Sequence, residues 1–348
     1  MKTYRFQQYL ELAIETHGKA RFAEYFDNEY RRVDETNSSN AEPAVRITVE
    51  IVDVLPSASE LEPDSEVIER KESFKKLFNY EFAIVNLHSD NIQIYFRHHP
   101  VANIYTTAVG VFLQAQVLEP VIYLAMLRKG ILLMHSAGVT RAGKSFVFPA
   151  YGGTGKTTTC MSLLQKGYHF LGDDLLLIDP DQRLVYPYPR PLHVFTYNIR
   201  NLQGARVPFS LMSVVYFKNL VRYFFELLLR TEFLISTRVH ADEIIPEFEL
   251  SPPGDLHNVI FLKKEGQSET IDLSTRELVA QHAQNIVESA DLNMSLYRFL
   301  DAEEVAAVKA MELEVTSKVL NGIDYFGYLN TRLINLENVS LYLDNVEA

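Results

Sequence analysis

The chain has 348 residues, of which 47% are hydrophobic and 22% charged, which is the composition of an ordinary globular protein. Its 33 Lys and Arg against 45 Asp and Glu give a net charge of −12, and a uniformly acidic chain repels nucleic acid and anionic membranes. The single cysteine, Cys160, excludes an internal disulfide and is typical of a reducing compartment. The acidic charge leads us to expect no nucleic-acid partner. Since the first residues also lack the apolar run of a signal peptide, we expect a cytoplasmic protein.

Residues 1–128 are expected to form a mixed, β-rich N-terminal module. Arg5–Thr16 is predicted to be an opening helix. Val45–Ile51 alternates polar and apolar residues with period two, which predicts a half-buried strand. Phe82–Leu87 and Ile92–Phe96 are separated by a short polar turn and are expected to form a hairpin.

Two apolar stretches are long enough to raise the question of a membrane span. Ala108–Leu127 carries two Gln, a Glu and a Pro, which favours a buried helix pair over a transmembrane segment. Leu211–Ile235, within an expected helical insertion at 209–235, carries one polar residue every four positions: Lys218, Arg222, Glu226 and Arg230. This spacing is typical of a core helix with a solvated stripe, and the alternative is a docking surface for a partner, a peptide or the membrane interface.

The most informative segment is Ala150–Thr157, which reads Ala-Tyr-Gly-Gly-Thr-Gly-Lys-Thr. It matches a phosphate-binding P-loop in which Ala stands in place of the usual first Gly. The apolar run Phe146–Phe148 before it predicts a buried strand, and Thr158–Lys166 after it predicts a helix closed by Gly167. This strand–loop–helix context favours nucleotide binding over the alternative, a glycine-rich turn before an ordinary helix.

The residue types in this loop suit phosphate chemistry. Glycines let the backbone N–H groups approach phosphate oxygens closely, Lys156 supplies a point charge, and the Thr157 hydroxyl is suited to Mg²⁺. The expected nucleotide-binding residues are Gly152, Gly153, Thr154, Gly155, Lys156, Thr157 and Thr158. ATP and Mg²⁺ are therefore the expected cofactors.

Asp173 and Asp174 follow the loop and are expected inside an apolar strand that continues through Ile178. Two adjacent carboxylates in such a strand are costly unless a cation or hydrogen bonds compensate them. Because side chains alternate along a strand, the two should have different tasks, one holding metal and the other accepting a proton. The alternative is a turn at the end of a strand with two solvated acids.

A set of motifs between His135 and Asp179 resembles the catalytic core of the HPr kinase/phosphorylase family. The set consists of the strand His135–Val139, the P-loop, the helix end Leu163–Tyr168 and the Asp pair, with an interval of 17 positions (173 − 156) from Lys156 to Asp173. The sequence Gly-Thr-Gly-Lys-Thr-Thr also resembles the P-loop of phosphoenolpyruvate carboxykinases, which share this nucleotide-binding core. The resemblance covers a small part of the chain.

The resemblance implies a serine kinase of the α/β class. Lys156 and Thr157 would serve phosphate and metal, Asp173 would be the general base, and Asp174 would be the metal-side carboxylate, with the order of the two Asp roles open. His135 would lie near the transferred phosphate, unless it is a core His satisfied by hydrogen bonds. Since Ala150 departs from the family pattern and the N-terminal module does not match, HPr itself is not expected as the acceptor.

One arginine is a further candidate for the site. Arg190 lies in Tyr186–His193, where Pro at three alternate positions holds the chain extended and is expected to expose it. Such an Arg could clamp a γ-phosphate or an acceptor carboxylate. A solvent-facing Arg on a stiff loop is the alternative.

These expectations combine into an α/β protein with an HPr-kinase/PEP-carboxykinase-like P-loop core at 129–272 and C-terminal helices at 273–348. Two capping boxes, Ser274 with Glu277 and Asp301 with Glu304, predict helices there. The expected function is an ATP-dependent kinase acting on a hydroxyl, either the Ser of a peptide or protein or a small molecule. Alternatives are a non-catalytic ATP-binding subunit and a carboxykinase-like enzyme, and a homo-oligomer is possible.

Overall fold

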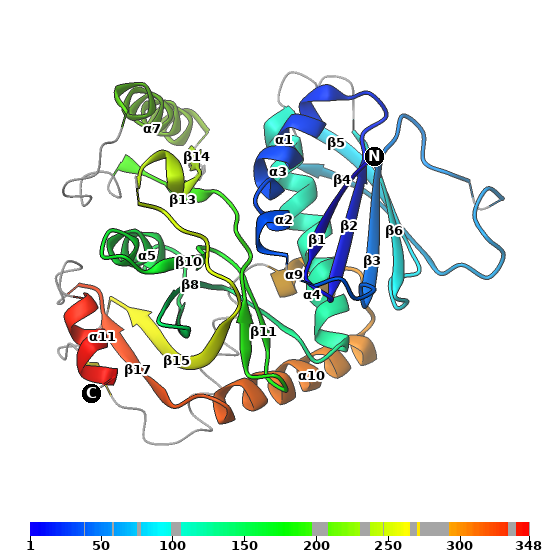
Figure 1. Ribbon diagram of the computed structural model, residues 1–348. Helices are drawn as coiled ribbons and strands as arrows, with labels where there is room; N and C mark the ends of the chain where they lie inside the picture. The colour runs from blue at the N-terminus through cyan, green and yellow to red at the C-terminus, as the bar shows by residue number, and fades with distance from the viewer. Residues whose placement is uncertain are drawn as a thin grey trace. The chain divides into compact units, whose positions relative to one another are not determined.

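The computed structural model describes residues 1–37, 39–57, 59–74, 78–98, 106–196, 208–229, 237–245, 247–264, 270–271, 292–332 and 339–347. It is a mixed α/β protein with mixed sheets and helices, as the sequence predicts (Figure 1). The chain divides into two compact units, Met1–Leu133 with Val287–Val315, and Met134–Ile286 with Thr316–Ala348. Residues 273–348 therefore do not form one separate segment, because the division falls within helix α10 (Ala302–Asn321).

The first unit is built on a six-stranded sheet in the order β1-β2-β3-β6-β5-β4. Its strands are β1 (Lys2–Phe6), β2 (Leu10–Glu15), β3 (Val45–Ile51), β4 (Val67–Phe74), β5 (Phe78–Val85) and β6 (Asn91–His98). The half-buried strand expected at Val45–Ile51 is confirmed as β3, and the expected hairpin is confirmed as the antiparallel pair β5 and β6. The β-rich character follows from the period-two patterns of these strands.

The opening helix predicted at Arg5–Thr16 is wrong, since this segment contributes to an antiparallel hairpin of β1 and β2. The physical reason is a period-two pattern, in which Leu10, Leu12 and Ile14 are all buried on one face. Gln7 adopts a positive φ of 53°, which turns the chain between the two strands.

The stretch expected as a buried helix pair is a succession of helical segments. These are α3 (Thr106–Leu113), the π-helical η2 (Gln114–Leu118) and α4 (Glu119–Arg128). Thr106–Arg128 is the one helix among the described residues that is long and apolar enough to cross a membrane, but 78% of its most apolar window is buried inside the structure. Helix α4 packs against β3, which explains why its residues are apolar on nearly every side.

The remaining helices of this unit are α1 (Ala20–Tyr30), α2 (Val33–Thr36), α9 (Leu292–Tyr297) and the first part of α10. The capping box predicted at the start of α10 is confirmed, because the Asp301 N–H donates to Glu304 Oε2 at 2.7 Å and the Glu304 N–H donates to Asp301 Oδ1 at 2.9 Å. The capping box expected at Ser274 and Glu277 lies outside the described residues.

The second unit contains the main mixed sheet, in the order β10-β8-β9-β15-β12-β11-β7, with β17 beside β15 and β16 beside β17. Its strands are β7 (Leu132–Met134), β8 (Ser136–Arg141), β9 (Lys144–Pro149), β10 (His169–Gly172), β11 (Leu176–Asp179), β12 (Leu184–Tyr186), β15 (Gly254–Lys263), β16 (Thr270–Ile271) and β17 (Tyr325–Asn330). Strands β9, β15 and β17 run parallel to one another, and the chain division falls within β7. The predicted strand before the glycine-rich loop is thus a central strand of the sheet.

Helix α5 (Lys156–Leu164) follows the glycine-rich loop and packs onto this sheet, together with α11 (Val339–Glu347). Phe146 and Phe148 of β9 join Cys160 and Met161 of α5 in one buried apolar cluster. The thiol of Cys160 is fully buried and burial raises its pKa well above the usual value, so it is an inert core residue. The start of α5 is therefore fixed rigidly against the end of β9.

A small sheet of β13 (Leu192–Val194) and β14 (Thr237–Val239) supports helix α7 (Phe209–Leu229), and the turn η3 (Ala241–Glu243) follows it. Of the polar stripe expected to face solvent, the structure describes only the side chain of Lys218, which is partly buried. Lys218 lies on the same side as the buried Val215, while Phe217 and Leu220 are 65% and 67% exposed. Residues 230–235 of the expected insertion lie outside the described residues.

Candidate functional site

The glycine-rich loop Ala150–Gly155 joins β9 to α5, and its backbone explains its composition. Gly153 and Gly155 have φ values of 75° and 109°, in the left-handed region where a side chain is strained. Gly155 is the N-cap residue of α5, and no side chain caps this helix end. The first N–H groups of α5 therefore point out of the N-terminal end of the helix without a side-chain cap, and such free N–H groups bind anions.

The loop is held in shape by hydroxyl groups. The Thr154 hydroxyl donates to the Tyr151 carbonyl at 2.7 Å, and the Thr331 hydroxyl donates to the Thr154 carbonyl at 2.6 Å. Thr331 follows β17, far away in the sequence, and no local signal could have found it. Thr158 is one of the expected nucleotide-binding residues. Its side chain is buried within the protein.

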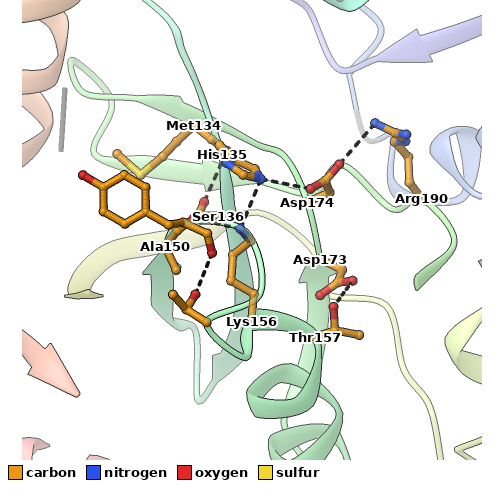
Figure 2. Close-up of polar contacts among 11 residues, drawn as sticks. Met134, His135, Ser136, Ala150, Lys156, Thr157, Asp173, Asp174 and Arg190 are labelled. Carbon is orange, nitrogen blue, oxygen red and sulfur yellow. Dashed lines mark hydrogen bonds and ion pairs between the residues drawn. The ribbon is translucent and has the colours of Figure 1, made fainter. Parts of the chain in front are cut away.

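Lys156 begins α5 and is buried, with a relative exposure of 9%. Its Nζ donates to the Ala150 carbonyl at 2.8 Å and lies 3.1 Å from His135 Nε2 (Figure 2). Burial lowers the pKa of Lys156, and the negative charges of Asp174 and Asp173 act in the opposite direction. The ammonium group is therefore held in a fixed position with little hydration, ready to contact an anion in front of the loop.

The Asp pair lies in a bend between β10 and β11, so the expectation that it lies inside one continuous strand is wrong. The register of β10 against β8 shifts between Phe170 and Gly172, which is a β-bulge directly before the pair. A Cβ at Gly172 would lie 2.7 Å from the Leu175 carbonyl oxygen, so only glycine fits this bend. The bulge and the glycine together aim the two carboxylates toward the loop.

Asp173 is the inner carboxylate and lies beside the start of α5. It accepts a hydrogen bond from the Thr157 hydroxyl at 2.9 Å on Oδ2, while its buried Oδ1 has no hydrogen-bond partner among the described residues (Figure 2). Burial and the neighbouring Asp174 charge raise the pKa of Asp173 to about 7, against the lowering effects of Thr157, Lys156 and a backbone hydrogen bond from His193. A buried carboxylate with an unpartnered oxygen is suited to a cation.

Asp174 is the outer carboxylate, and its side chain is 36% exposed. Its Oδ1 lies 3.2 Å from His135 Nε2, and its Oδ2 lies 4.0 Å from the Arg190 guanidinium. Burial acts to raise the pKa of Asp174, but the hydrogen bond to His135 and the positive charges of His135, His193 and Arg190 hold it well below its usual range. The two neighbouring acids therefore differ in charge state near neutral pH.

His135 joins the Lys156 and Asp174 sides of the site, because its Nε2 contacts both partners. A single ring nitrogen cannot donate to Asp174 and accept from Lys156 at the same moment, so its protonation state decides which bond forms. Its side chain is 14% exposed, which is typical of a core histidine. It also contacts both expected site residues, Lys156 and Asp174.

Arg190 is buried, with 6% exposure, so the expectation that the proline-rich segment exposes it is wrong. The Tyr188 N–H donates to the Leu171 carbonyl at 2.9 Å, which fastens this segment along the end of β10. The fastening brings Arg190 beside Asp174 and the His193 N–H beside Asp173. The backbone role of His193 is a feature that sequence reasoning missed, because no side-chain pattern signals it.

All the expected site residues lie in the second unit, and the structure brings His135, Lys156, Thr157, Asp173, Asp174 and Arg190 together (Figure 2). Among the described residues, no group of three or more His, Cys, Asp or Glu is arranged to hold a metal ion by itself.

A scan against protein-family models and a search of curated proteins both gave no match.

Proposed function

We propose that this chain is an ATP-dependent phosphotransferase that moves the γ-phosphate to a hydroxyl group, most simply the Ser of a peptide or protein. The observation that carries the proposal is the pair of acids in front of α5. One acid is bound to the Thr157 hydroxyl, and the other lies within reach of His135 and Arg190. Binding phosphate alone would require the loop and a lysine, but not a second, ionised carboxylate.

The phosphates of ATP would lie on the N–H groups between Gly152 and Thr157, with Lys156 as the positive charge. Its ammonium group already has one carbonyl partner and little hydration, so it loses little on binding a phosphate oxygen. The left-handed conformations of Gly153 and Gly155 support this assignment, because they direct successive N–H groups to one side.

Mg²⁺ fits the Asp173 side of the site. The unpartnered, buried Oδ1 of Asp173 and the hydroxyl of Thr157 are hard oxygen ligands, and Mg²⁺ in phosphoryl-transfer sites takes few protein ligands besides phosphate and water. When bound, the ion would neutralise charge on the phosphates. Thr157 and Asp173 are thus the proposed metal-side pair, and this replaces the expectation that Asp174 holds the metal.

Asp174 is the proposed general base. It is ionised, it is more exposed than Asp173, and His135 and Arg190 hold it in position. The lowered pKa makes Asp174 a weak base in the free protein. A hydroxyl bound next to it would replace part of its hydrogen bonding to His135, which would raise its pKa and strengthen it as a base. Arg190 and Lys156 would stabilise the charge on the transferred group. The spatial grouping of His135, Lys156 and Asp174 supports the proposal that the core is HPr-kinase-like.

The proposal is tested by incubating the protein with ATP, Mg²⁺ and Ser-containing peptides, and by measuring both nucleotide turnover and labelled phosphate in the peptides. Lys156→Ala should lower turnover by about 10²–10³-fold, because it removes a fixed charge from the transferred phosphate. Lys166→Ala is the matched control, since Lys166 lies exposed just beyond α5, and it should change nothing.

Full turnover in Lys156→Ala would exclude the phosphate-binding role of the loop. Tight ATP binding by the wild type without turnover, whatever hydroxyl acceptor is added, would instead support a regulatory subunit that uses ATP occupancy as a switch. Since Lys156 is buried, circular dichroism of the variant must accompany both measurements.

A further inference from the structure

The glycine-rich loop has two unlike flanks in the sheet. On one flank of β9 lie β8, which His135 precedes, and β10, which the Asp pair follows. On the other flank lie β15 and β17, which run side by side and parallel to β9 (β15 and β17 in Figure 1). Ligands of α/β sheets bind outside the carboxyl ends of parallel strands, so the ends of β15 and β17 belong to the binding region.

The ends of these two strands contact the loop directly. Thr331, the first residue after β17, donates its hydroxyl to the Thr154 carbonyl at 2.6 Å. The Thr331 N–H donates to the carbonyl of Lys263, the last residue of β15, at 2.8 Å. A Cβ at Gly155 would lie 3.7 Å from the Thr331 side chain. A phosphate chain bound on the loop is therefore bordered by the side chains at the ends of β15 and β17.

Lys263 is a cation on this flank with donors left for a ligand. Its Nζ lies 4.8 Å from the centroid of the Tyr328 ring, and in the part of the chain that the structure describes it forms no ion pair. An ammonium group has three donors, and its attraction to a ring face does not satisfy all of them. Lys264 beside it is exposed, and Glu265 lies outside the described residues.

An aromatic side chain of the loop lies on the same flank. Tyr151 is 39% exposed, so part of its ring is accessible. Burial and the charge of Tyr151 raise the pKa of Tyr328 to about 12, and the two phenol groups are thus near each other. An accessible ring beside an ammonium group suits a nucleoside, because a base stacks on the ring and ribose hydroxyls accept hydrogen bonds from the ammonium.

We propose that ATP lies across the loop with its γ-phosphate at Asp174 and its nucleoside at the β15–β17 flank, where Tyr151 stacks on the base and Lys263 donates to the ribose hydroxyls. This inference rests on the proposed function, which places the γ-phosphate beside Asp174. Since a triphosphate chain is linear, its nucleoside leaves the loop on the side away from Asp174. The reverse direction would place the base among His135, Asp174 and Arg190, whose charges suit a phosphate.

The first test compares ATP with inorganic tripolyphosphate, which has the phosphate chain but no nucleoside. In calorimetry of the full chain with Mg²⁺, the wild type should bind ATP about tenfold or more tightly than tripolyphosphate. Tyr151→Ala should remove most of this difference and leave the affinity for tripolyphosphate unchanged. Tyr151→Phe keeps the ring and should bind ATP as the wild type does.

Lys263 is tested in the same titrations. Lys263→Ala should weaken binding of ATP by roughly tenfold and leave binding of tripolyphosphate unchanged, because it removes a charged donor to the ribose. Lys264→Ala is the matched control, since it removes an exposed lysine at the next position, and it should change neither affinity.

The second test maps the base itself. 8-Azido-ATP activated by light on the full chain should label peptides that contain Tyr151 or Tyr328. In the reverse direction of the nucleotide, the label would instead appear on the peptide that contains Arg190 and His193.

The outcomes separate this inference from the proposed function. Failure of the wild type to bind either ligand would overturn both. Equal affinity of the wild type for ATP and tripolyphosphate, or a label on the Arg190 peptide, would overturn this inference alone. Equal loss of both ligands in Tyr151→Ala would do the same, since the ring would then only shape the loop.

Discussion

The two sides of the candidate site contain the same chemical group in opposite states. Asp173 has a buried, unpartnered oxygen and a pKa raised to about 7, whereas the pKa of Asp174 is held well below its usual range. The residues are neighbours in the chain, so the difference comes from their surroundings. Asp173 faces a hydroxyl and the start of α5, and Asp174 faces an imidazole and a guanidinium. The comparison teaches that an acidic pair is assigned to roles by its partners.

The largest effect is expected for Asp174→Asn. Because the amide cannot accept a proton from a hydroxyl, the rate of phosphate transfer should fall by about 10²–10⁴-fold, with the Mg²⁺ concentration for half-maximal turnover nearly unchanged. Single-turnover transfer from labelled ATP measures it. If Asp173→Asn shows this pattern and Asp174→Asn loses metal, the roles are those expected from the resemblance.

The second expected effect is on stability as a function of pH. A carboxyl whose folded pKa is raised binds its proton more tightly when folded, so Asp173 destabilises the protein as pH rises from about 4 to about 7. Asp173→Asn should therefore be more stable than the wild type at pH 8, by on the order of a few kcal/mol, and equal to it near pH 4. Urea unfolding without Mg²⁺ at both pH values measures the difference.

Asp174→Asn should have the opposite sign in the same experiment. Its lowered pKa gives stability that is present above the unfolded pKa and is lost as pH falls through the folded value. The variant should thus be less stable than the wild type at neutral pH. Equal stability of the two Asn variants at pH 8 would contradict the contrast between the two acids.

A smaller effect is expected for Asp173→Asn on metal use. Replacing the proposed oxygen ligand should raise the Mg²⁺ concentration needed for ATP turnover by about 10–100-fold. The maximal rate at saturating Mg²⁺ should change less than in Asp174→Asn. A Mg²⁺ titration of turnover in both variants separates them, and an unchanged titration would remove Asp173 from the metal side.

The smallest effect is expected at Thr157. Thr157→Val keeps the shape but removes the hydroxyl that donates to Asp173, and it should weaken the apparent Mg²⁺ affinity by roughly tenfold. Thr157→Ser keeps the hydroxyl and serves as the control. If Val and Ser behave alike in the Mg²⁺ titration, the hydroxyl takes no part in metal binding.

The local features of the site could be predicted from sequence. Short apolar patterns predict the strand before the loop and the helix after it. The glycines at 153 and 155 predict backbone conformations that other side chains disfavour, and the structure has positive φ at both. The different surroundings of the two Asp residues could not be predicted, because Thr157 and His135 contact the pair through the fold and not through the local sequence.

Two other differences have the same physical origin. Proline spacing predicted an extended Tyr186–His193, but not the Tyr188 hydrogen bond that buries Arg190 beside Asp174. In α7 the spacing of polar residues predicted a helix with two unlike sides, and only the packing on β14 decides which side faces the protein. The short apolar run of β1 and β2 fits both a helical and a strand period, so sequence alone does not distinguish the hairpin from a helix.

The Lys156 bond to the Ala150 carbonyl has a consequence for which residues the loop tolerates. The loop uses a backbone oxygen at position 150, which every amino acid possesses, and the Ala150 side chain only has to fit the closed apolar cluster around α5. The positions that demand glycine are instead 153 and 155, by their φ values. A sequence pattern that insists on glycine at the first position would reject this loop for a feature that its chemistry does not use.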